Sequence, residues 1–185
     1  MQSETELNLI KRAAEGEHRA FRLLVEEHHL NVFNLVQRIV QQRELAEEVA
    51  QDVFLKAFRS LHRFKGTARF STWLYRIAYN EAISNSRKKK FSFESLNETN
   101  VSSETATMQA EEVGGVEEDR LEQLELAIAE LNADSQALLT MYYQQNQSVK
   151  AIGEIIGESE SNVKVRLFRI RKQILATIAA VPQQP

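Results

Sequence analysis

The side chains best suited to bind another molecule lie near the C-terminus of the chain. Segment 161–175 holds five basic residues and no acid. Lysine, arginine and asparagine reach phosphates and base edges in the major groove of DNA. The candidates in this segment are Asn162, Lys164, Arg166 and Arg169. The pattern predicts a DNA-recognition helix, although an ordinary amphipathic helix with a basic solvent face has the same composition.

Apolar residues at helical spacing predict two helices that would position these side chains. The packing face of the first helix consists of Ile152, Ile155 and Ile156. Gly157 permits a sharp turn, and Ser159 or Ser161 can cap the second helix. The apolar positions of the second helix are Val163, Leu167, Ile170 and Ile174. Residues 151–172 therefore have the pattern of a helix-turn-helix.

A second basic stretch lies in the first half of the chain. Residues 53–90 contain ten Lys or Arg and a single acid, Glu81. Interleaved with them are the aromatic residues Phe64, Phe70, Trp73, Tyr75 and Tyr79. Single-stranded DNA is bound by a positive groove with pockets for unstacked bases. Loop 64–70 is the natural pocket, and a helix follows from about Ser71, a candidate N-cap, to Arg87.

The aromatic and basic residues of this stretch also have simpler roles. Trp73, Ile77 and Phe70 lie at helical spacing, so we expect them to anchor the loop from beneath by packing in the core. The run 87–90 is typical of a solvated helix end that the helix dipole favours.

An acidic helix face precedes the basic stretch. Apolar residues repeat at spacings of three and four over 44–61 and predict a helix there. The other face of this helix bears Glu47, Glu48, Gln51 and Asp52. Taken alone, these residues fit an outer face that is simply solvated.

Composition predicts an all-α protein of two small helical domains. The chain has 185 residues and 43% hydrophobic content, enough for packed cores. Its two prolines, Pro182 and Pro185, lie in the terminal tail, and hairpin signals are absent. Without cysteine it has neither disulfides nor thiolate metal sites. A polar start and the lack of a long apolar span predict a cytoplasmic location without membrane insertion.

Charge segregates along the chain although the net charge is only -3. Residues 1–90 carry 16 Lys or Arg against 11 Asp or Glu, whereas 91–119 carry none against 8. The segment 91–119 is also rich in Ser, Thr and Glu, which predicts a flexible acidic linker. The predicted organisation is a helical domain at 1–90, the linker at 91–119, a second helical domain at 120–181 and a tail at 182–185. In the first domain, further helices are expected at 4–15 and from about residue 17.

The order of these parts resembles the extracytoplasmic-function (ECF) group of bacterial sigma factors of the sigma-70 class. AEEVAQDVFLKAFRSLHRF at 46–64 is similar to the second conserved region of that family. KGTARFSTWLYRIAYNEAISNSRKKK at 65–90 resembles the regions that melt the promoter and bind its -10 element. Residues 131–175 resemble the domain that binds the -35 element. FSTWLYRIAYN is the most specific of these signals.

The resemblance implies a specificity subunit of RNA polymerase, with no enzymatic activity and no cofactor or metal. Core polymerase, at its β′ clamp helices, would bind Glu47, Glu48, Gln51, Asp52 and Leu55. The -10 element would contact Lys65, Thr67, Arg69, Ser71, Asn80, Ser84 and Arg87. The -35 element would contact Ser161, Asn162, Lys164, Arg166 and Arg169. Other implied partners are the polymerase β flap, promoter DNA and an anti-sigma factor, which could hold the protein at the membrane in response to stress or envelope signals.

The sequence departs from the family pattern at three positions. Glu158 stands in the turn where an aliphatic residue is usual, Ser84 where Asp is common and Phe168 where His is frequent. The promoter sequence therefore does not follow from the resemblance. The linker could mimic nucleic acid in a polymerase channel or be a plain solubilising tether.

Two other classes of protein share some of these features. A stand-alone helix-turn-helix repressor would use the same basic helix but would have no need for an acidic face followed by a basic aromatic loop. A metal-dependent hydrolase would need clustered ligands, and the histidines are His18, His28, His29 and His62, without HExxH spacing. We expect these histidines to be surface or helix-packing residues.

Overall fold

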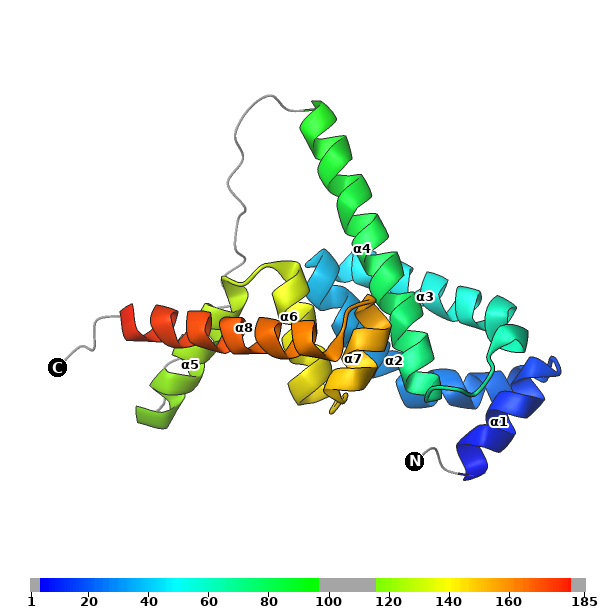
Figure 1. Ribbon diagram of the computed structural model, residues 1–185. Helices are drawn as coiled ribbons and strands as arrows, with labels where there is room; N and C mark the ends of the chain where they lie inside the picture. Colours follow the sequence, from blue (N-terminus) through cyan, green and yellow to red (C-terminus); the bar gives the residue numbers. More distant parts are fainter. Residues whose placement is uncertain (1–3, 97–115, 181–185) are drawn as a thin grey trace.

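The computed structural model consists of helices throughout the described backbone, which covers residues 4–96 and 116–180 (Figure 1). Side chains are described for residues 5–87 and 120–180. This confirms the predicted all-α class. Within these ranges no helix is both long and apolar enough to cross a bilayer.

The N-terminal lobe packs four α-helices around one apolar core. Its elements are α1 (Glu4–Ala14), α2 (His18–Val40), α3 (Arg43–Ser60), the 3-10 turn η1 (Leu61–Arg63) and α4 (Phe70–Leu96). The core stripe of α2 includes Leu24, Val32, Leu35 and Val36, all nearly inaccessible to solvent. Helix α2 packs on α1, α3 and α4, so it is the central helix that fixes the others. Its apolar residues recur at helical spacing in the sequence, which predicts the buried stripe.

The C-terminal lobe contains the helix-turn-helix. Its elements are α5 (Val116–Ala129), α6 (Ala133–Leu139), the π-helical turn η2 (Thr140–Gln144), α7 (Val149–Ile156) and α8 (Glu160–Ala180). Helix α8 packs on α5, α6 and α7 through the apolar stripe Val163, Leu167, Ile170 and Ile174. The predicted core face of α8 is therefore confirmed.

One predicted helix start is wrong. Helix α4 begins at Phe70, because the amide of Trp73 already donates to the carbonyl of Arg69 at 3.1 Å, and it ends at Leu96. Ser71 consequently lies inside the first turn and is not the N-cap. Since α4 extends to Leu96 and α5 begins at Val116, both ends of the predicted linker 91–119 are helical. The remaining linker segment, 97–115, lies outside the described residues.

The two lobes pack against each other. Helix α4 contacts α7, and α2 contacts α6 and η2, so both longest helices of the first lobe take part. Figure 1 shows α7 lying beside the N-terminal half of α4, with α8 extending away from the contact. The free chain is therefore compact, which the sequence does not specify.

Candidate nucleic-acid interface

The turn between α7 and α8 has the geometry of a helix-turn-helix. Gly157 adopts φ +77°, a left-handed conformation that ends α7 without steric cost to glycine. The carbonyl of Gly153 accepts hydrogen bonds from the amides of Gly157 at 2.9 Å and Glu158 at 3.0 Å. The Ser159 hydroxyl accepts from the amide of Asn162 at 3.2 Å. Of the two predicted caps, Ser159 is thus the one that starts α8.

Helix α8 presents most of its predicted DNA-contacting residues to solvent. Ser161, Asn162, Lys164 and Arg169 are exposed, on the side away from the buried stripe. Arg166 is instead half-buried, and its Nη1 lies 2.6 Å from Oε1 of Glu158. The glutamate at the unusual turn position therefore has a partner within the same motif. In this compact state Arg166 faces the turn and the first lobe.

Aromatic side chains support the loop between η1 and α4. Phe70 is buried, and the ring centroids of Phe64, Phe70 and Trp73 lie 5.3 to 5.8 Å apart. This cluster confirms that the rings pack beneath the loop. Above it, Lys65, Thr67 and Arg69 are exposed, whereas Ser71 is half-buried.

Helix α4 carries the other predicted -10 contacts along one line. Asn80, Ser84 and Arg87 are all exposed and lie four and three residues apart, so they share a face. Glu81 does not weaken the positive potential of this face as a free acid, because its Oε1 lies 2.6 Å from Nζ of Lys56 on α3. The sole acid of the basic stretch thus joins α3 to α4.

The acidic face of α3 points to solvent. Glu47, Glu48, Gln51 and Asp52 are exposed, and Leu55 is 53% exposed. The buried residues of the same helix are Ala46, Val49, Ala50, Val53 and Ala57. The face is available for another macromolecule, and an exposed leucine beside four polar residues is suited to a protein partner.

Polar contacts join the two lobes. The Tyr79 hydroxyl on α4 donates to Oδ1 of Asp134 at 3.4 Å, and Nε2 of Gln145 donates to the carbonyl of Asn31 at 2.7 Å. Burial raises the pKa of Tyr79 to about 12, assisted by the nearby Asp134 carboxylate. Burial likewise raises the pKa of Tyr75 to about 12, while a hydrogen bond with Asn31 opposes the shift. Both phenols are therefore neutral at physiological pH.

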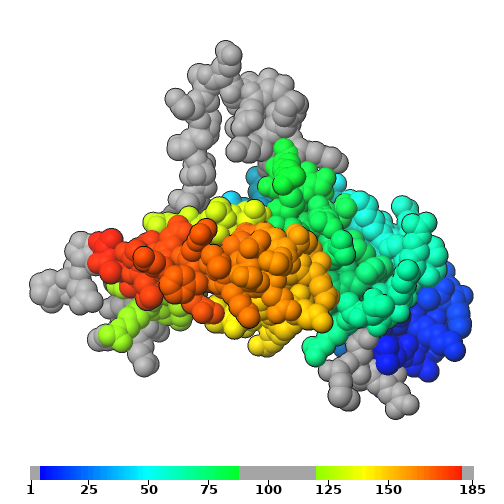
Figure 2. All heavy atoms as spheres, in the orientation of Figure 1, coloured from blue at the N-terminus to red at the C-terminus, as the bar shows by residue number. Residues whose placement is uncertain are grey.

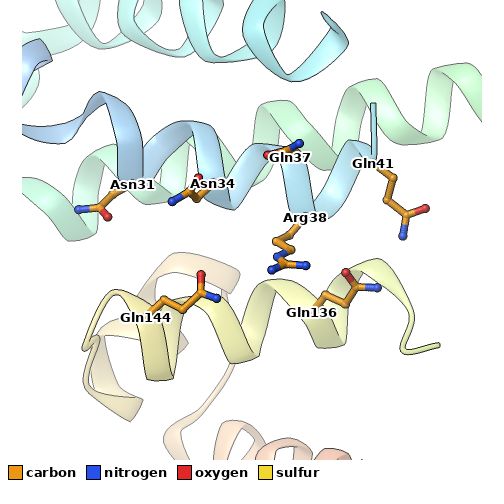
Figure 3. A pocket seen from close by; sticks show the side chains of 7 residues that line it. All are labelled: Asn31, Asn34, Gln37, Arg38, Gln41, Gln136 and Gln144. Atoms are coloured by element: carbon orange, nitrogen blue, oxygen red, sulfur yellow. The ribbon is translucent and has the colours of Figure 1, made fainter. Parts of the chain in front are cut away.

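A polar cleft of about 690 Å³ opens between the lobes. Figure 3 shows Arg38 pointing from α2 towards the helical turns that carry Gln136 and Gln144. The remaining residues around it are Asn31, Asn34, Gln37 and Gln41. Amide side chains line both walls, so separating the lobes here exposes less apolar surface than separating an apolar interface would.

An apolar groove of about 500 Å³ adjoins the cleft within the second lobe. Leu124, Ile128, Leu139, Ile174 and Leu175 supply its apolar lining, and Arg38 and Arg171 lie at its edge. The groove is an apolar face on the second lobe, which suits the anti-sigma partner that the family resemblance implies. Its occupant stays a prediction.

Three metal-ligand side chains lie together at the junction of α1 and α2. Glu6, Glu27 and His28 each place one ligand atom within 4.8 Å of the others. The imidazole of His28 is buried, with Nε2 3.3 Å from Oε1 of Glu6 and its ring 5.3 Å from that of Phe70. These contacts make His28 a helix-packing residue, as predicted from the sequence.

Two family models match the chain: sigma-70 region 2 over residues 24–92 and sigma-70 region 4 over residues 121–174. Together they cover more than half of it. The chain is also 32% identical over 177 residues to the ECF RNA polymerase sigma factor SigW of Bacillus subtilis, covering 89% of this chain and 94% of SigW. The chain belongs to the ECF subfamily of sigma-70 class sigma factors.

Other sigma factors align with it over different lengths. The sigma-E factor of Haemophilus influenzae is 29% identical over 177 residues, covering 92% of this chain and 93% of that protein. The sigma-H factor of Pseudomonas aeruginosa is 43% identical over 79 residues, but this match spans only 43% of this chain and 41% of sigma-H.

Solved structures share the fold of this ECF sigma factor. CnrH, in complex with the cytosolic domain of CnrY, has a TM-score of 0.70 at 20% identity, covering 97% of this chain and 100% of CnrH. The sigma factor RpoE of Bartonella quintana, in complex with the anti-sigma factor NepR, has a TM-score of 0.70 at 18% identity, covering 88% of this chain and 98% of RpoE.

Sequence reasoning missed the residues that join the lobes of this ECF sigma factor. Asp134 and Gln145 carry no motif, and their partners Tyr79 and Asn31 lie more than fifty residues away in the chain. A tyrosine on the predicted -10 helix was the available signal, since a buried phenol needs a hydrogen-bond partner.

Proposed function

We propose that this protein is a sigma subunit that binds core RNA polymerase and directs it to promoters through their -10 and -35 elements. The observation that carries the proposal is the arrangement of the two family regions. In each region, helices with a buried apolar stripe carry an exposed polar face. These faces are acidic on α3, which suits a protein partner, and basic on α4 and α8, which suits DNA. The stand-alone repressor is not favoured, because the matched region 2 is no part of a simple duplex-binding protein.

Core polymerase would bind the exposed face of α3. Leu55 supplies the apolar contact, and Glu47, Glu48, Gln51 and Asp52 supply charge and hydrogen bonds. Charged rims govern the orientation and rate of association more than its affinity. The polymerase β flap would bind the second lobe, which leaves the α8 face open to DNA.

The loop and α4 would capture the opened -10 strand. The exposed Lys65, Thr67 and Arg69 stand above the aromatic cluster, where an extruded base can be held near phosphate-binding cations. Extruding a base costs a few kcal/mol. Binding of the base by the loop and of the strand by Asn80, Ser84 and Arg87 offsets this cost, so strand opening follows from selective binding.

Both DNA contacts cannot form while the lobes are packed together. Elements centred about 25 base pairs apart lie about 85 Å apart along B-DNA at about 3.4 Å per pair. A compact chain of this length has a radius of gyration of about 16 Å. The lobes must therefore separate on polymerase, and the tether then raises the effective concentration of the second contact.

Separation of the lobes can be measured by energy transfer. The chain lacks cysteine, so Arg59→Cys and Gln173→Cys, both exposed, provide unique labelling sites on opposite lobes. We expect transfer to be high in the free protein and to fall when core polymerase is added. Transfer that stays high in a complex that still transcribes would contradict the opening step.

An anti-sigma factor would hold the compact state. The solved relatives CnrH and RpoE are each bound to a partner, CnrY and the anti-sigma factor NepR respectively. By analogy the partner of this protein would bind where the lobes meet and keep it from polymerase. In that state the protein would be cytoplasmic or held at the membrane through its partner.

Reconstituted transcription tests the proposal. Core polymerase plus this protein should start transcripts from a subset of a promoter library, whereas core polymerase alone should not. Lack of association with core polymerase, or association without transcripts from any template, would refute it.

A further inference from the structure

Two exposed apolar side chains lie in the N-terminal half of α8, whereas the third on this helix, Leu175, lines the apolar groove. Val165 is 44% exposed and Phe168 is 65% exposed, while the buried stripe of the same helix is complete without them. Figure 2 shows the orange and red atoms of this helix uncovered across one face of the molecule. Phe168 thus leaves a large apolar surface in water, and covering that surface with a partner would be favourable.

These two side chains lie among the predicted DNA contacts. Residues three apart on a helix are neighbours, with Cβ atoms about 5 to 6 Å apart. Ser161 and Lys164 lie on the N-terminal side of the pair, and Arg169 follows it, all exposed. The pair covers one to two base-pair steps of about 3.4 Å when the helix lies in the major groove.

The chemistry around the pair favours DNA over a protein partner. Two side chains form a patch much smaller than the several hundred Å² typical of a protein-binding surface. Their neighbours are cations and a hydroxyl, which suit phosphates and base edges. In the major groove the one apolar group that a base presents is the C5-methyl group of thymine.

We propose that Val165 and Phe168 select thymine in the -35 element by packing against its C5-methyl groups. This inference rests on the proposed function of α8 in binding the -35 duplex. Lys164 and Arg169 then hold the backbone and polar base edges, and the apolar pair adds preference for methyl-bearing steps. Cytosine, which lacks the methyl group, would leave the apolar pair facing a polar edge.

The test removes only the methyl group. A promoter is first selected from a library with the holoenzyme, and each thymine of its -35 element, on either strand, is then replaced by deoxyuridine. Burial of one methyl group corresponds to an affinity change of about fourfold. We expect one or two positions at which deoxyuridine lowers holoenzyme binding about three- to fivefold.

Protein variants assign the effect. Phe168→Ala should bind thymine and deoxyuridine templates equally at the affected position, because the methyl group then has no partner. Val165→Ala should likewise abolish or reduce the preference for thymine over deoxyuridine at a neighbouring position. Leu126→Ala is the matched control, because it removes a similarly exposed apolar side chain from α5 of the same lobe, and it should keep the wild-type preference.

Three outcomes would overturn the inference. They are a selected -35 element without thymine, deoxyuridine templates bound as well as thymine templates at every position, and a Phe168→Ala variant that keeps the full preference. If Phe168→Ala instead weakens core binding without altering the preference, the pair is a protein contact and the inference also fails. A holoenzyme that selects no promoter at all refutes the proposed function itself, so the two failures are distinguishable.

Discussion

A methyl group on Gly153 should destabilise the helix-turn-helix. A Cβ atom at this position would lie 2.6 Å from the carbonyl oxygen of Glu158, a backbone atom that cannot rotate away. The carbonyl of Gly153 also accepts the two hydrogen bonds that close the turn, from the amides of Gly157 and Glu158. Moving the turn to relieve the clash therefore strains both bonds.

The magnitude follows from three contributions. Overpacking of this kind costs about 1 to 3 kcal/mol, and weakening two hydrogen bonds costs about 1 to 3 kcal/mol in total. Alanine regains about 1 kcal/mol of helix propensity over glycine. The net loss for Gly153→Ala is about 1 to 5 kcal/mol, which at about 2 to 4 °C per kcal/mol lowers the Tm of a chain of this size by at least about 2 °C.

Thermal unfolding followed by circular dichroism checks this value. Gly157→Asn is the matched control, because position 157 has φ +77° with nothing within 4 Å of a Cβ, and asparagine tolerates that conformation. It should lower the Tm far less than Gly153→Ala. A Gly153→Ala protein with unchanged or raised Tm would refute the assigned packing of the turn.

Three further predictions concern the faces and the lobe contact. Asp52→Lys should lower the affinity for core polymerase at least about tenfold, because it reverses the charge at the contact, and it should leave the Tm unchanged because Asp52 is exposed. The control is Glu15→Lys, which reverses an exposed charge just after α1. An equal loss of affinity in both variants would contradict the assignment. Arg169→Ala should weaken binding of the holoenzyme to the -35 duplex. Loss of a phosphate contact should also reduce the slope of log K against log salt concentration by about one. An unaltered affinity and slope would show that Arg169 is not part of the interface. Because the pKa of Tyr79 is raised in the folded state, its neutral phenol contributes stability that is complete below pH 10 and is lost as the pH rises towards 12. Tyr79→Phe should therefore show a smaller fall in Tm over this pH range. A fall identical to that of the wild type would contradict this contribution.

The apolar stripes and the helix-turn-helix could be predicted because they depend on neighbours close in sequence. Val163, Leu167 and Ile170 repeat at helical spacing, and all three are buried in α8. Gly157 signals its own left-handed turn because few other residues adopt one. Local periodicity and turn chemistry therefore carried the fold class and the position of the candidate interface.

The lobe contact could not be predicted because it joins residues without any local pattern. Gln145 and Asn31 lie 114 residues apart and meet only when both lobes are folded. The ion pair between Arg166 and Glu158 could not be predicted either. Glu158 is unusual at its position in the turn, but the sequence does not indicate which residue it pairs with. The composition of 91–119 does not indicate that α4 runs to Leu96 and that α5 begins at Val116, because an acidic, serine-rich segment is typical of a tether.

Promoter-dependent transcription in a reconstituted system tests the central claim most directly. Core polymerase with the wild-type chain should yield transcripts that start at fixed distances from shared -10 and -35 sequences, and Asp52→Lys should reduce them strongly at limiting protein concentration while remaining folded. Transcription that is absent from every template, or that is equally active without this protein, would contradict the account.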